Sequence, residues 1–142
     1  TRLHYMAIAP APSPNGQMRP IARPMKDFSP GALVRVPFPY VDQAKRAYRP
    51  AVVVAQVTGG PTGPLLWVLM VTSAENRRWP GDIALIDDHA AIGLPAPSLI
   101  RTAKIATVAA SDAEWRGDIG AVHWAAVCAQ LRDRADLWSM AP

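Results

Sequence analysis

The sequence predicts a mainly β protein: a small barrel, or a strongly curled antiparallel sheet, with a C-terminal helix covering it. Short runs of apolar and β-branched residues follow one another between residues 33 and 110, separated by clusters of Gly, Pro and polar residues. The apolar residues change to a period of three or four only after Gly120. The sequence lacks the βαβ alternation of nucleotide-binding folds and has no Gly-rich phosphate loop, so that fold class is excluded.

The apolar runs predict strands at 33–36, 50–57, 65–73, 82–86 and 98–110, the last as one or two short strands. Pro37 and Pro39 are expected to end the first strand, because proline cannot donate a ladder hydrogen bond. Pro50 is acceptable as the first residue of the second strand. The third strand is apolar on both faces at its start, which places it at the centre of the sheet. The segments between these runs are expected to be loops and turns.

The tail from Gly120 onward predicts one amphipathic helix. Its apolar residues recur at steps of three or four along the chain: Trp124, Val127, Cys128, Leu131, Ala135 and Trp138. Charged residues of the same tail lie largely off this stripe, so the stripe is expected to pack on the sheet.

The chain divides by composition into an arm, 1–28, and a barrel domain, 29–142. The first 30 residues carry six prolines and no sustained apolar period, and we expect the arm to be extended or disordered. These 30 residues hold four basic groups and one acidic group, a net +3 of the total +4. The high isoelectric point is therefore weak evidence that the domain itself binds nucleic acid.

The composition also argues against several functional classes. The single cysteine, Cys128, cannot form an internal disulfide, and we expect a reducing cytoplasm. The longest apolar runs, such as LLWVLMV at 65–71, are too short to cross a bilayer, and the first residues lack the pattern of a secretory signal. No Cys/His cluster has zinc-ligand spacing, and the adjacent Asp87 and Asp88 are more typical of a solvated turn, so no metal or other cofactor is expected.

Basic and hydroxyl side chains at strand ends form the candidate site. Arg49 precedes the second predicted strand, and Thr72 closes the third. If these strands are antiparallel neighbours, the start of one lies beside the end of the other. A guanidinium next to a hydroxyl suits a phosphate group. Taken singly, Arg49 could instead form a surface ion pair, and Thr72 could satisfy a backbone group. The phosphate site is favoured because further cations occur nearby in the sequence: Arg77, Arg78, Arg101 and Lys104.

Four pieces of the sequence, in this order, resemble the PemK/MazF family of toxins from type II toxin–antitoxin systems. They are GALVRVPFPYVD with the basic loop after it, RPAVVVAQ, VLMVTSA and GLPAPSLIRTAKIATV, and IGAV then opens the final helix. The order and spacing match across 30–138. The resemblance implies an SH3-like barrel of about five to seven strands with a C-terminal helix. It also implies a homodimer, inhibited by an acidic antitoxin, that cleaves single-stranded RNA, including mRNA, without a metal and so stops growth.

The resemblance assigns catalytic roles to Arg49, Thr72, Ser73 and Arg101. Some members have an aspartate two residues after the last of these arginines, where this chain has Ala103. Arginine stays protonated and is a poor base, so a water or a carboxylate such as Asp42 would take up the proton of the attacking hydroxyl. Ala103 keeps open an alternative in which the barrel is weakly active, or only binds RNA or an antitoxin peptide.

RNA contacts are expected from the basic loops and the aromatic residues beside them: Lys45, Arg46, Tyr48, Arg77, Arg78, Trp79 and Lys104. Arginine and lysine would neutralise phosphates, and exposed aromatic rings would stack on bases.

Overall fold

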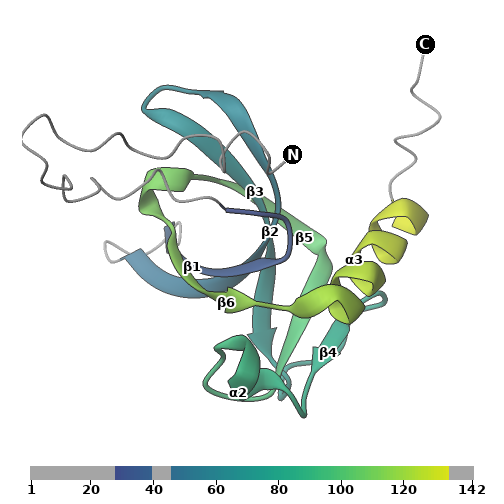
Figure 1. Ribbon diagram of the computed structural model, residues 1–142. Helices are drawn as coiled ribbons and strands as arrows, with labels where there is room; N and C mark the ends of the chain where they lie inside the picture. The colour runs from purple at the N-terminus through teal and green to yellow at the C-terminus, as the bar shows by residue number, and fades with distance from the viewer. Residues whose placement is uncertain (1–27, 40–45, 135–142) are drawn as a thin grey trace, which may run out of the picture.

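A computed structural model of the chain describes residues 28–39 and 46–134. Six strands form one antiparallel sheet in the order β4-β5-β3-β2-β1-β6. The elements are β1 (Ala32–Pro39), β2 (Arg46–Gly60), β3 (Gly63–Ser73), β4 (Ile83–Leu85), α2 (His89–Ile92), β5 (Ser98–Ala109), the short 3₁₀ helix η1 (Ala110–Asp112), β6 (Glu114–Asp118) and α3 (Gly120–Arg134). The sheet curls into a half-barrel with α3 at its side, which confirms the predicted fold class (Figure 1). The predicted arm up to residue 27, Asp42, Lys45 and Trp138 lie outside the described residues.

The predicted third strand is central, as expected. β3 pairs with β2 on one side and with β5 on the other. Gly60 pairs with Gly63, so β2 and β3 are joined by a tight turn, and their hairpin projects at the end of the sheet away from α2 (Figure 1). Both faces of β3 are covered along residues 68–71, so the apolar side chains of this segment are buried, whereas Trp67 before it is exposed.

The first strand was predicted too short, since β1 continues through Pro37 and has Pro39 as its last residue. β6 pairs only with Ala32–Arg35, so among the described residues the later part of β1 has a neighbour on the β2 side alone. Proline has no N–H to donate to the ladder. It therefore costs no hydrogen bond where its nitrogen faces the side of the strand that has no neighbouring strand. The start of β2 was also predicted too late, because β2 begins at Arg46 and not at Pro50.

Besides the short η1, two elements were not predicted. β6 has the sequence EWRGD, and only its Gly117 is buried, so an edge strand of this kind has no apolar alternation to reveal it. The other is the single turn α2, which lies in a segment predicted to be a loop. Sequence periodicity cannot identify a helix of four residues.

The core lies on both faces of the curled sheet, because successive side chains of a strand point to opposite faces. One cluster fills the first face and includes Val34, Val36, Ala51, Val53, Leu66, Val68 and Met70. The other lies on the second face and includes Leu33, Val52, Leu69, Val71, Leu85 and Ile100. Val127 of α3 is buried in this second cluster, and Trp124 and Leu131 pack against it. The predicted apolar stripe of the helix therefore covers the second face.

Candidate active site

Arg49, Thr72 and Arg101 share the first face of the sheet. Arg49 pairs with Val36 of β1, and Arg101 pairs with Met70 of β3; both partners belong to the first core cluster. Thr72 lies two residues beyond Met70 and therefore points to the same face. The ladder between β2 and β3 ends at the pair of Ala51 and Met70, and the same register continued by two residues brings Arg49 opposite Thr72. Their proximity stays a prediction, which this register supports.

The two hydroxyl residues at the end of β3 point to opposite faces. The Thr72 hydroxyl accepts a hydrogen bond of 2.6 Å from the Asn76 side-chain amide, which leaves its own proton for another acceptor. The Ser73 hydroxyl accepts the backbone N–H of Glu75 at 3.2 Å, and the Ser73 carbonyl accepts that of Asn76 at 3.1 Å. Ser73 thus closes the turn that leaves β3, whereas Thr72 faces the shared side with Arg49.

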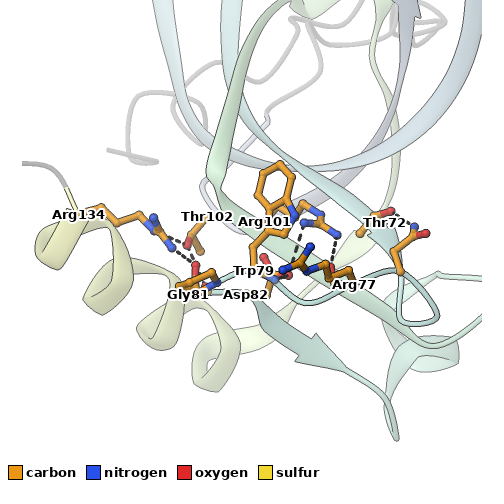
Figure 2. A network of polar contacts seen from close by, with 10 residues as sticks. Thr72, Arg77, Trp79, Gly81, Asp82, Arg101, Thr102 and Arg134 are labelled. Atoms are coloured by element: carbon orange, nitrogen blue, oxygen red, sulfur yellow. Dashed lines mark hydrogen bonds and ion pairs between the residues drawn. The ribbon is translucent and has the colours of Figure 1, made fainter.

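Arg101 differs from Arg49 in burial. Arg49 is exposed, whereas Arg101 is 6% exposed. The Arg101 guanidinium carbon lies 4.0 Å from the centroid of the Trp79 ring, and Nη2 donates to the Arg77 carbonyl at 2.7 Å (Figure 2). Nη1 lies 3.9 Å from Asp82 Oδ2, an ion pair between two buried side chains. The guanidinium is therefore bound to the loop between β3 and β4 and covered by an indole.

The loop over Arg101 ends in the sequence WPGD, which forms a β-turn. The Asp82 N–H donates to the Trp79 carbonyl at 3.1 Å, and the Trp79 N–H donates to Asp82 Oδ2 at 2.8 Å. Pro80 occupies the first central position and Gly81, with φ of 84°, the second. This arrangement matches a type II turn, which needs positive φ at its second central residue and favours glycine there.

The end of α3 holds this turn from the other side. Arg134 Nε donates to the Thr102 hydroxyl at 3.0 Å, and Arg134 Nη2 donates to the Pro80 carbonyl. The Thr102 hydroxyl in turn donates to the Gly81 carbonyl at 2.9 Å. Figure 2 shows the chain of contacts running from α3 through the turn to Arg101 and Trp79. Sequence reasoning did not identify Asp82, Thr102 or Arg134; WPGD was the available signal, because it is a typical turn sequence.

The other predicted RNA contacts are divided among several places. Arg77, Arg78 and Lys104 are exposed, the first two in the loop that carries Trp79. Tyr48 neighbours Arg49 in β2 and so points to the other face, where the Arg35 guanidinium lies 4.9 Å from its ring centroid. The structure thus does not bring Tyr48 together with Arg49. Lys45 and the side chain of Arg46 lie outside the described residues.

A second polar cluster lies away from this site, in a pocket between the β4–α2 connection and the start of α3. His123 Nε2 lies 2.6 Å from Asp88 Oδ2, and this hydrogen bond lowers the pKa of the Asp88 carboxyl below its ordinary value. Within 28–39 and 46–134, no group of three or more His, Cys, Asp or Glu side chains could hold a metal ion. The helices of the same segments are all too short or too polar to span a bilayer.

Comparisons with known proteins agree with this architecture. Two crystal structures of MazE–MazF from Deinococcus radiodurans, forms III and II, match with TM-scores of 0.53 and 0.54 at 21% sequence identity. The matches cover 79% and 78% of this chain, and 96% and 95% of the matched chains. At this identity the likeness concerns the fold. A comparison with curated proteins finds no match.

The fold and site together define a small β half-barrel, closed on one face by a helix, with basic side chains at one end of its sheet. The family model described as the PemK-like, MazF-like toxin of type II toxin–antitoxin systems matches residues 29–133. The chain belongs to this family of toxins, as the resemblance of its sequence motifs predicted.

Proposed function

We propose that this chain is a toxin that cleaves single-stranded RNA, including mRNA, and so stops growth, with Arg49 and Thr72 binding the scissile phosphate. The observation that carries this proposal is the strand register, by which the exposed Arg49 side chain and the Thr72 hydroxyl point to the same side of the sheet. Membership of the toxin family supports the reaction class. Arg77 and Arg78 add positive charge from the neighbouring loop, which attracts the RNA backbone.

In the proposed reaction the nucleophile comes from the RNA itself. The 2′-oxygen attacks the adjacent phosphorus, and the bond from phosphorus to the 5′-oxygen breaks. The products are a 2′,3′-cyclic phosphate and a 5′-hydroxyl, because the leaving 5′-oxygen takes up a proton from water. Negative charge builds up on the phosphoryl oxygens during attack, and the planar guanidinium of Arg49 can donate two hydrogen bonds to them. Thr72 donates its hydroxyl proton to a phosphate oxygen or orients the 2′-hydroxyl.

The proton of the 2′-hydroxyl needs an acceptor other than arginine. Ala103 is exposed on β5 and offers no carboxylate, and Asp82 is buried beside Arg101. We propose that water accepts this proton, which requires no acidic residue at position 103.

The test of this function is the chemistry of the RNA ends. The purified chain is incubated with an unstructured RNA in excess EDTA, with Arg49→Ala as the matched control. We expect fragments ending in a 2′,3′-cyclic phosphate and beginning with a 5′-hydroxyl, produced by the wild type alone. Fragments with a 5′-phosphate, or activity lost on chelation, would contradict the mechanism.

The inhibitor is proposed to be an acidic, partly disordered antitoxin segment. Such a segment would order across the exposed Arg49, Arg77 and Arg78, exchanging conformational entropy for charge neutralisation. The two matching crystal structures, each of MazE with MazF, support a protein partner of this kind. Because mRNA is the proposed substrate, the cytoplasm is the proposed place of action.

A homodimer is proposed from an exposed apolar patch on the second face of the sheet. Trp67 of β3 is 45% exposed and Ile105 of β5 is 56% exposed. Ile105 pairs with Leu69, two residues from Trp67, so both side chains point to the face that α3 covers elsewhere. Sedimentation at several protein concentrations tests this assembly, and a monomer at every concentration would contradict it.

The second candidate is a barrel that binds RNA or the antitoxin without cutting. It is favoured by Ala103 and by the contacts that already bind the Arg101 guanidinium to the loop. RNA binding with intact RNA ends in the assay above would select it.

A further inference from the structure

Trp79 is an exposed aromatic residue on a loop beside the candidate site. It belongs to the loop between β3 and β4 and is 42% exposed, although tryptophan is highly buried on average. No core cluster of the described residues includes it. Tryptophan is enriched at interfaces, because its ring offers a large apolar surface and its N–H a polar one, so an exposed indole on a loop is a candidate contact for a partner.

One face of the indole is already occupied. The Arg101 guanidinium lies over the ring, with 4.0 Å between its carbon and the ring centroid, and it is itself held by the Arg77 carbonyl and the Asp82 carboxylate. The exposed surface of the side chain therefore lies at the ring edge and on the opposite face. Contact with a buried guanidinium fixes the orientation of the ring before any partner arrives.

The backbone beneath Trp79 is also fixed. Two hydrogen bonds join Trp79 to Asp82 across the type II turn, and Arg134 and Thr102 bind the carbonyls of Pro80 and Gly81. An aromatic ring on so constrained a loop loses little further conformational entropy on binding, which favours affinity. The turn is thus suited to present a flat surface rather than to close over a ligand.

The charge around the ring indicates the class of ligand. Arg77 and Arg78 are exposed in the same loop, and Asn76 joins the loop to Thr72 at the end of β3. A ligand that stacks on the indole and satisfies these arginines combines a planar π system with negative charge. An unpaired nucleotide has both properties, with its base for the ring and its phosphates for the guanidinium groups.

We propose that Trp79 is a nucleobase platform: its open face stacks on one unpaired base of single-stranded RNA, while Arg101 supports the other face. The proposal rests on the proposed function, since RNA is taken as the ligand. It assigns Arg101 to support of the platform, whereas Arg49 and Thr72 contact the phosphate.

The test uses the full chain and an RNA that it cuts. The cleavage positions are first mapped on a long unstructured RNA. A short labelled RNA around one position then carries a 2′-deoxy nucleotide at the attacking residue, so that it binds without being cut. Its dissociation constant is measured for the wild type, Trp79→Leu, Trp79→Phe and Trp115→Leu. Trp115 is the matched control, because it is 59% exposed on β6 and has no place in the proposed site.

We expect Trp79→Leu to weaken binding by roughly 5- to 150-fold, the equivalent of about 1–3 kcal/mol for one stacked base. Trp79→Phe, which keeps an aromatic ring, should stay within a few-fold of the wild type, and Trp115→Leu should not change binding. A series of probes with one abasic position each should reveal a position that weakens wild-type binding but leaves Trp79→Leu unaffected.

Several results would overturn the proposal. If the wild type cuts RNA and both Trp79 variants bind like it, the platform is wrong and the ribonuclease stands. Suppose instead that Trp79→Leu binds weakly, and that every abasic position weakens its binding by the same factor as it weakens wild-type binding. The indole then does not stack on a base. Should Trp79→Leu fail to fold, the two remaining variants still test the proposal. If Trp79→Phe weakens RNA binding by the same factor as Trp115→Leu, the loss is not specific to position 79 and aromatic stacking there is rejected. A wild type that neither cuts nor binds RNA overturns the proposed function and the platform together.

Discussion

Arg49 and Arg101 lie on the same face of one sheet and meet different surroundings. Arg49 is exposed near the start of β2, whereas Arg101 of β5 is buried beneath Trp79 and bound to Arg77 and Asp82. The exposed guanidinium of Arg49 is open to solvent and can meet a phosphate there. One that is buried in an ion pair has to break that pair first, and breaking a buried pair is costly. Burial thus separates two arginines that sequence motifs present as equivalent.

The largest expected effect is on catalysis, from Arg49. Arg49→Ala should lower the cleavage rate on the order of 10²–10³-fold, because it removes a donor to the charge that develops on the phosphoryl oxygens. Arg49→Lys should also fail, since lysine keeps the charge but loses the planar fork. Single-turnover cleavage measures both, and the free energy of unfolding should change by no more than about 0.5 kcal/mol. Normal cleavage by Arg49→Lys would place Arg49 among ordinary surface residues.

The next effect concerns stability, from Arg101. Arg101→Ala should reduce the free energy of unfolding by about 3 kcal/mol, because it leaves the Asp82 carboxylate buried without its cation. The double variant Arg101→Met with Asp82→Asn should lose less, since neither charge remains. Urea denaturation of the three proteins checks this. If the Arg101→Ala protein were as stable as the wild type, Arg101 would contribute no more to the free energy of unfolding than the exposed Arg49.

A smaller effect is expected at Gly81. Gly81→Ala should cost about 1–3 kcal/mol, because its φ of 84° strains any residue with a Cβ, and that Cβ would meet the Arg134 guanidinium. Part of the cost should disappear in an Arg134→Ala background, where only the backbone strain remains. Thermal unfolding of the two single variants and the double variant measures this coupling; strict additivity would show that α3 does not hold the turn.

The smallest effect should come from His123 and Asp88, away from the site. Since the Asp88 pKa is lowered in the folded chain, its contribution to stability is present above the ordinary titration range of the carboxyl. That contribution is lost as the pH falls through the folded-state pKa. His123→Ala should return the Asp88 pKa toward its ordinary value, as followed by NMR titration. Cleavage at neutral pH should not change, and a clear loss would link the two regions.

The sequence predicted the parts of the fold that apolar patterns specify. Strand β3, the first half of β5 and the helix α3 contribute apolar side chains to the core, and all were found near the predicted positions. β6 was missed because its side chains are mostly exposed. For the site, strand order alone directed Arg49 toward Thr72. The burial of Arg101 could not be predicted, since it depends on a loop, a turn and the last residue of α3 meeting in space.

The contact between Arg134 and the turn also bears on the timing of synthesis. Arg134 is the last residue of α3, and it binds a turn formed more than 50 residues earlier in the chain. A ribosome releases that turn well before it releases the helix, so a nascent chain has the loop but not the residue that holds it. The contacts that hold the Trp79 loop from the side of α3 can therefore form only after that helix has left the ribosome. In a toxin assembled in this order, the strands of the sheet are made before the aromatic loop gains its last support.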